Sequence, residues 1–145
     1  MLLDREDVGP GQPGAEGGQT PLMMAAEIGR EAVVKMLLDR EDVDPNQRDN
    51  KRGQTPLICA AMAGHKVVVK MLLEREDVDP DQTEAGCGHT PIFFASWKGH
   101  EGVVKILLKR QDVNPNHRGA ICGRTPIYLA AKKGHEGLVD RKSVV

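Results

Sequence analysis

Aromatic residues are scarce in this sequence, which has two Phe, one Tyr and one Trp among 145 residues. Because large rings usually fill a single globular core, their scarcity favours thin, closely stacked layers of Ala, Val, Leu and Met. The chain also lacks an excess of either charge, since 20 basic residues are balanced by 21 acidic ones. The composition therefore gives no reason to expect binding to nucleic acid or to a membrane surface.

Long apolar runs are missing as well. No run approaches the roughly 18 to 20 residues that span a bilayer, and the amino terminus has no long apolar signal segment. The cysteine count of 3 is odd, and no Asn-x-Ser/Thr glycosylation acceptor occurs. We therefore expect a soluble protein with reduced thiols and an intracellular location, the cytoplasm.

What the sequence does have is a repeat of 35 residues. Thr-Pro pairs begin at Thr20, Thr55, Thr90 and Thr125, so by subtraction each pair starts 35 positions after the one before. This register predicts the truncated tail of a preceding repeat, three complete repeats and an incomplete terminal repeat. In chain order these segments cover residues 1–17, 18–52, 53–87, 88–122 and 123–145.

The first half of each unit has the signals of a short helix. Thr20 can cap the helix, and Pro21 fits its first position, where no N–H donor is needed. Gly29 is expected to end the helix in the left-handed conformation that glycine adopts most easily. The apolar residues between these signals form one stripe at helical spacing: Leu22, Ala25 and Ala26.

The second half of the unit predicts a longer amphipathic helix over residues 31–40. Its apolar residues are Val33, Val34, Met36, Leu37 and Leu38. After it, Asp44-Pro45-Asn46 predicts a turn, and an extended finger runs to Gly53. Because neither helix can bury its apolar stripe alone, stability must come from the stacking of neighbouring units. The expected fold class is an all-α solenoid.

The unit resembles the ankyrin repeat, whose signature T-P-L-H-x-A is represented by Thr20-Pro21-Leu22-Met23-Met24-Ala25 and its three copies. The residue sequence of the repeats, for example REDVDPNQ and GHEGVVK, also resembles that of long ankyrin arrays in large fungal multidomain proteins. The resemblance implies an ankyrin-repeat solenoid, in which stacked helix-turn-helix units are joined by long, hairpin-like finger loops.

Two features depart from the family pattern. The period exceeds the family's typical value of about 33 residues, which predicts longer fingers. The signature histidine is absent, and in the family its imidazole tends to hydrogen-bond the threonine, so apolar contacts must compensate for this lost brace. The residues in its place are Met23, Ile58, Phe93 and Tyr128.

Patterns that suggest a ligand site have simpler explanations. Gly9-x-Gly11-x-x-Gly14 spells a dinucleotide-binding motif, but it follows a helical tail and aligns with an ordinary finger. His65, His100 and His135 occupy one repeat position. Because stacked helices lie about 8 to 10 Å apart, equivalent histidines on neighbouring units are too distant to share a metal. Each histidine is instead expected to form the same structural hydrogen bond. We expect no metal, no cofactor and no enzymatic activity, because no catalytic constellation is present.

The cysteines and the charged runs also predict structural roles. Cys87 and Cys122 lie one repeat period apart in the sequence. Because the spacing of about 8 to 10 Å between stacked layers exceeds the roughly 7 Å Cα–Cα limit of a disulfide, reduced thiols are expected. Cys59 is interpreted as a small core residue. The Arg-Glu-Asp runs predict a solvated edge with weak ion pairs. They begin at Arg5, Arg40 and Arg75.

The resemblance implies that the chain, as a monomer, binds a protein partner through the concave face formed by the short helices and finger loops. In the family, binding uses residues that differ between repeats, and we call these positions the variable surface. In this chain they are Gln19, Glu27, Ile28, Lys51, Arg52, Gln54, Met62, Ala63, His89, Trp97, Lys98, Arg124, Lys132 and Lys133.

Two alternatives remain open at this point. Trp97 either packs over Met62 and the stem of Lys132, or anchors an apolar strip that includes Ile28 and Met62. The whole array either binds a partner, or serves as a structural spacer or an intramolecular lid within a larger multidomain protein.

Overall fold

The computed structural model describes residues 18–118, 123, 125–132 and 134. Within these ranges the chain forms seven α-helices and no β-strand. The expected tail over residues 1–17, with its glycine motif, lies outside the described residues. So do four single residues for which expectations were stated, namely Cys122, Arg124, Lys133 and His135.

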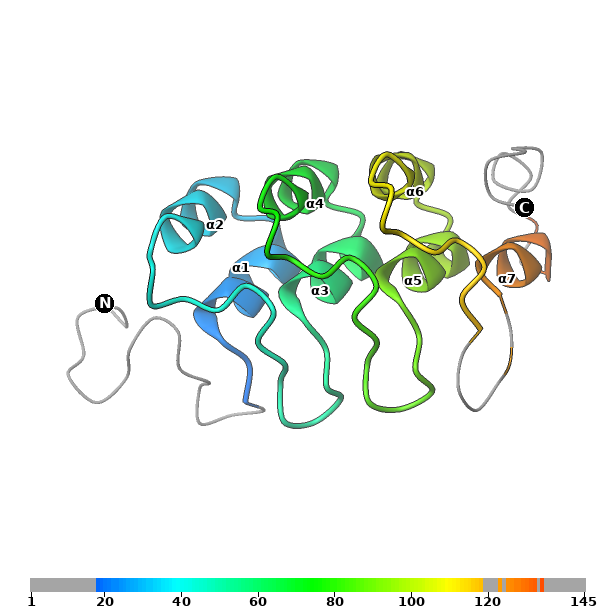
Figure 1. The fold of residues 1–145 in the computed structure, drawn as a ribbon, viewed down its shortest axis with the longest axis horizontal. Helices are drawn as coiled ribbons and strands as arrows, with labels where there is room; N and C mark the ends of the chain where they lie inside the picture. The colour runs from blue at the N-terminus through cyan, green and yellow to red at the C-terminus, as the bar shows by residue number, and fades with distance from the viewer. Residues whose placement is uncertain (1–17, 119–122, 124, 133, 135–145) are drawn as a thin grey trace.

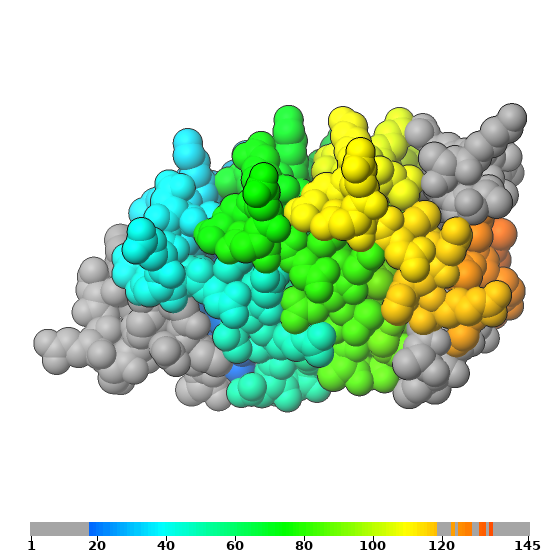
Figure 2. Space-filling model, in the orientation of Figure 1, coloured from blue at the N-terminus to red at the C-terminus, as the bar shows by residue number. Residues whose placement is uncertain are grey.

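The helices alternate between two rows (Figure 1). The first helices of the units are α1 (Pro21–Ile28), α3 (Pro56–Ala63), α5 (Pro91–Lys98) and α7 (Pro126–Lys132). The second helices are α2 (Glu31–Leu38), α4 (Lys66–Leu73) and α6 (Glu101–Leu108). Each helix contacts the next helix of its own row, and the finger loops point away from the second helices (Figure 1). Successive units lie side by side as bands across the molecule (Figure 2), which confirms the all-α repeat array.

The first helices begin and end at the predicted signals. The Thr20 hydroxyl accepts a hydrogen bond from the Met23 N–H at 3.2 Å, and Pro21 occupies the first helical position. Gly29 follows α1 with a φ of 87°, in the left-handed region. The same cap and the same glycine conformation recur in α3 and α5. The predicted stripe of Leu22, Ala25 and Ala26 is buried.

The second helices are shorter than expected. The predicted helix over residues 31–40 ends at Leu38 as α2, so both helices of the unit have 8 residues. The chain leaves the helix because the Arg40 N–H bonds to the Leu37 carbonyl in a tighter closing turn, at 3.2 Å.

The apolar face expected for α2 is only partly correct. Val34 and Leu37 are buried, but Val33 is 39% exposed and Met36 is 61% exposed. In the next unit, Val68 occupies the position of Val33 and is fully buried, because α4 packs against α2. Among the described residues no helix precedes α2 in its row. Burial at this repeat position therefore depends on the preceding unit, which a single helical period does not reveal.

One apolar core runs along the stacked units. It joins both rows of helices and includes the valine that follows each second helix: Val43, Val78 and Val113. Three of the residues that replace the signature histidine are buried, as expected for apolar compensation: Met23, Ile58 and Phe93. The fourth, Tyr128 in α7, is 50% exposed.

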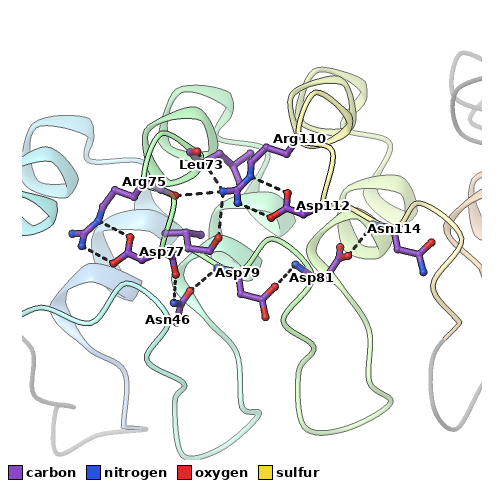
Figure 3. A network of polar contacts seen from close by, with 10 residues as sticks. Asn46, Leu73, Arg75, Asp77, Asp79, Asp81, Arg110, Asp112 and Asn114 are labelled. Carbon is purple, nitrogen blue, oxygen red and sulfur yellow. Dashed lines mark hydrogen bonds and ion pairs between the residues drawn. The ribbon is translucent and has the colours of Figure 1, made fainter.

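The charged runs after the second helices do more than the sequence indicated. The expected ion pairs are present between Arg40 and Asp42 at 3.0 Å, both exposed, and between Arg75 and Asp77 at 2.7 Å. The corresponding Arg-Gln-Asp run pairs Arg110 with Asp112 at 2.7 Å. However, Arg110 Nη1 also donates to carbonyls of the preceding unit, including Leu73 at 3.4 Å (Figure 3). Arg75 Nη1 donates in the same way to the Leu38 carbonyl at 2.8 Å. Arg75 and Arg110 therefore connect neighbouring units, whereas the exposed Arg40–Asp42 pair is the solvated edge that the sequence predicted.

A second set of ties joins the turns that follow (Figure 3). The Asn46 side chain donates to the Asp77 carbonyl at 2.7 Å and accepts from the Asp79 N–H at 3.0 Å. One unit later, Asp81 stands where Asn46 stood, and its Oδ2 accepts from the Asn114 N–H at 2.8 Å. Its Oδ1 is buried without a hydrogen-bond partner among the described residues. The Asn46 side chain therefore forms two hydrogen bonds to the following unit, whereas the equivalent Asp81 side chain forms only one with the described residues. We call this repeated set of inter-unit contacts the ladder.

Candidate functional site

The finger between α2 and α3, called the first finger, is folded around one carboxylate. Asp49 Oδ1 accepts hydrogen bonds from the backbone amides of Lys51, Arg52 and Gly53, at 3.1, 2.7 and 2.9 Å. The side chains of Lys51 and Arg52 are exposed at this fixed tip. The Ala85 N–H donates to the Arg52 carbonyl at 2.8 Å, which connects the tip to the next finger. Two residues of the variable surface are thus placed on a braced loop.

In the second finger, between α4 and α5, Glu84 accepts amide hydrogen bonds in the same way, and it occupies the same repeat position as Asp49. Glu84 accepts from the amides of Gly86, Cys87 and His89, at 2.6, 2.8 and 3.1 Å. Burial by itself raises the pKa of Glu84, but these amide donors outweigh burial and hold the pKa below the usual glutamate value. Sequence reasoning missed this role, although an acidic residue recurring 35 positions later was a visible signal.

In the first two units, the residue before the capping threonine contacts the end of its own first helix. Gln19 Nε2 donates to Glu27 Oε2 at 3.3 Å. One unit later, Gln54 Nε2 contacts Met62 Sδ at 3.5 Å, and Gln54 itself is buried. These two glutamines of the variable surface therefore position other residues of that surface.

His89 occupies the same repeat position in the third unit, and its environment is different. Its side chain is only 12% exposed. Its ring stacks on Phe93 with centroids 3.6 Å apart, and Nδ1 lies 3.8 Å from Glu84 Oε1. Burial lowers the pKa of His89, and the Glu84 carboxylate only partly opposes this effect. The neutral ring is thus a packing element beneath the variable surface.

Trp97 lies beside that aromatic packing. It is half-buried and, like Met62, packs against the cluster of Ile58, Phe93 and Phe94. Its ring centroid is 6.5 Å from that of Phe94. Trp97 therefore packs against this aromatic cluster, whereas its expected packing over Met62 and the stem of Lys132 and its role as a binding anchor stay predictions.

Histidines tie the ends of the first helices to the following unit, as the repeated hydrogen bond predicted. His65 Nε2 lies 3.0 Å from the Glu27 carbonyl, and His100 Nε2 lies 3.0 Å from the Met62 carbonyl. Each carbonyl accepts, so Nε2 carries the proton in both rings. The ring of His100 covers Gly64, where a Cβ would lie 2.7 Å from the imidazole. The backbone at two positions of the variable surface is thereby fixed.

The variable surface contains a hollow of about 190 Å³. Its lining comes from three units: Glu27, Arg52, Gln54, Cys59, Met62, Ala63 and Lys98. All except Cys59 belong to the variable surface. The burial of Cys59, together with nearby carboxylates, raises the pKa of this thiol to about 12. The thiol is therefore protonated at neutral pH and is a poor nucleophile, and its burial agrees with the expected core position.

The other candidate residues lie as follows. Ile28, Ala63 and Lys98 share one repeat position at the end of the first helices, and all three are exposed. Lys132 is exposed on α7, and Gln19 is half-buried. Arg124 and Lys133 lie outside the described residues. The exposed members therefore change from apolar to small to cationic along one line of equivalent positions.

No group of three or more His, Cys, Asp or Glu side chains is arranged for metal binding in the part of the chain that the structure describes. Across the same residues, no helix is long and apolar enough to cross a bilayer.

The fold and this surface define an all-helical repeat array. Its capping and core residues recur from unit to unit, while the residues on the side of the first helices and fingers vary. The family model for ankyrin repeats matches the chain three times, over residues 1–84, 41–119 and 76–141. The chain therefore belongs to the ankyrin repeat family, whose members are generally non-enzymatic modules for protein–protein interaction. A search of curated proteins gave no match.

Proposed function

We propose that this array binds another protein through the variable surface on the side of the first helices and fingers. The observation that carries the proposal is the hollow lined by six residues of that surface, drawn from three successive units. A binding site assembled from several units is what a repeat array offers and a single unit lacks.

The contrast between framework and surface supports this proposal. Equivalent core positions hold similar residues, such as Leu22, Leu57 and Ile92, which are all buried. Equivalent surface positions differ in chemistry, as with Glu27 and Met62. Because hydrogen bonds donated by histidines and glutamines, and those accepted by the finger carboxylates, already hold this surface, a partner would encounter a preorganised site with little ordering entropy left to lose.

Affinity capture from the cells that make the protein tests the proposal against the spacer or lid. The surface variant combines Ile28→Arg with Ala63→Arg, both at exposed positions of the first helices. The matched control combines Met36→Arg with Val67→Arg, at exposed apolar positions of the second helices. Circular dichroism checks that both variants remain folded.

Binding through the variable surface predicts a protein that the wild type and the control retain and the surface variant loses. The purified partner should show the same order in calorimetric titrations. Equal retention by both variants, or loss only in the control, would place the interface elsewhere. Absence of any partner with defined stoichiometry would favour the spacer. Residence in the cytoplasm and a monomeric state belong to the same proposal, and imaging and sedimentation test them.

A further inference from the structure

The hollow is lined by two cations whose N–H donors form no hydrogen bond or ion pair with any described residue. Arg52 is exposed on the first finger, and its guanidinium has no hydrogen bond or ion pair with any described residue. The Lys98 ammonium lies 5.3 Å from the Trp97 ring centroid, a cation–π contact that leaves its N–H donors available. Both side chains line the same hollow.

The one carboxylate in the lining is already engaged. Glu27 Oε2 accepts from Gln19 Nε2 at 3.3 Å, and its backbone carbonyl is bound by His65. The lining therefore has two cations against one carboxylate, in a chain whose overall formal charge is -1. The Asp49 carboxylate also acts on the Cys59 thiol, but its Oδ1 is occupied by the three backbone amides of the finger. The two cations are therefore the charged groups of the hollow with hydrogen-bonding capacity left among the described residues.

Between the charged groups the lining is mixed. Met62, Ala63 and Cys59 contribute apolar or weakly polar atoms, and Gln54 contributes an amide whose Nε2 contacts Met62 Sδ. A volume of about 190 Å³ is enough for one medium-sized side chain, since a cavity of roughly 150 Å³ holds a benzene ring. The site thus combines an apolar contact at Met62 and Ala63 with two cations, and a guanidinium is suited to paired hydrogen bonds with a carboxylate.

We propose that this hollow accepts an acidic side chain of the protein partner, carried by a segment with an adjacent apolar residue. Arg52 and Lys98 bind the carboxylate, and Met62 with Ala63 contacts the apolar neighbour. The inference rests on the proposed function and adds the chemistry of the segment that is recognised. A basic segment would instead meet two like charges, which disfavours it.

Selection of random linear peptides against the intact chain tests this chemistry without a known partner. The site variant carries Arg52→Glu and Lys98→Glu. The control carries Lys70→Glu and Lys105→Glu, two exposed lysines of the second helices, and therefore has the same net charge. Circular dichroism and thermal melts of all three proteins verify that the variants are folded before binding is compared.

The expected result is enrichment of peptides with Asp or Glu beside an apolar residue. Such peptides should bind the control like the wild type, bind the site variant at least about tenfold more weakly, and lose affinity with added salt. The inference is overturned if the enriched peptides lack acidic residues, if they bind the site variant like the wild type, or if no peptide is enriched. In each case the capture experiment still decides independently whether the variable surface binds a partner.

Discussion

Replacing Asp81 with Asn should stabilise the array, because the structure contains the completed version of the same contact one unit earlier. There, Asn46 donates to the Asp77 carbonyl at 2.7 Å while accepting from a backbone amide. Asp81 keeps the accepting half through Asn114 at 2.8 Å, but its Oδ1 is buried and without a partner among the described residues. By repeat equivalence, an amide nitrogen at position 81 would donate to the Asp112 carbonyl.

The size of the effect follows from that missing hydrogen bond. An unsatisfied buried polar atom costs about 1 to 3 kcal/mol and a hydrogen bond contributes about 0.5 to 1.5 kcal/mol. Because Asp81 is only half-buried, we expect a gain of about 1 kcal/mol at neutral pH, near the lower end of these ranges. This corresponds to a rise in Tm of about 3 °C for a chain of this length.

The gain should depend on pH. Burial raises the pKa of Asp81, and the nearby carboxylates of Asp79 and Asp112 add to that rise, while the hydrogen bond from Asn114 opposes it. A group whose pKa is raised by folding stabilises the fold when protonated, and that stability is lost as the pH increases through the raised pKa. The advantage of Asp81→Asn over the wild type should therefore be full at neutral pH, shrink as the pH falls through the raised pKa, and be smallest below the ordinary aspartate pKa.

Urea titrations of the wild type, Asp81→Asn and the reverse change Asn46→Asp measure these differences at pH 7 and about pH 3.5, below the reference aspartate pKa. The reverse change should destabilise at pH 7 by a similar amount, because it removes the donor to the Asp77 carbonyl. If Asp81→Asn is neutral or destabilising at pH 7, or if its gain is the same at both pH values, the account of this ladder is wrong.

Three further changes test other contacts. His100→Ala removes the tie to the Met62 carbonyl and should cost about 1 to 2 kcal/mol in urea titrations, whereas Lys105→Ala on the exposed side of α6 should cost little. Glu84→Ala removes the acceptor of three amides and should accelerate their hydrogen exchange; since folding lowers the Glu84 pKa, this difference should shrink as the pH falls through that lowered value. Trp97→Ala removes a ring packed beside Phe94 and should lower the free energy of unfolding by about 1 kcal/mol; unchanged melting would mean that the ring contributes no packing.

Local signals in the sequence were sufficient for the first helices. The cap at Thr20 and the left-handed Gly29 depend only on residues of the same helix, so a short stretch of sequence is enough to predict them. The exposure of Val33 was not predictable in this way, because its equivalent Val68 is buried only through the neighbouring unit. The bonds of Arg75 and Arg110 to preceding carbonyls were missed for the same reason, since they span 37 positions of the chain.

The candidate site shows the same division. Variation between repeats picked out six of the residues that line the hollow. It did not distinguish exposed residues such as Lys98 from His89, whose side chain is only 12% exposed. That distinction depends on the stacking of His89 against Phe93, and ring stacking is set by rotamers that a sequence pattern does not specify.

The most direct test of partner binding through the variable surface is a crosslinking map in the cells that make the protein. A photoreactive amino acid is placed singly at positions 28, 63 and 98, which are equivalent and exposed on the first helices. It is also placed at positions 35, 70 and 105, which are equivalent and exposed on the second helices. The account predicts one partner protein crosslinked from positions 63 and 98, which both line the hollow, and no crosslink from the second set. A partner captured only from the second helices would contradict it.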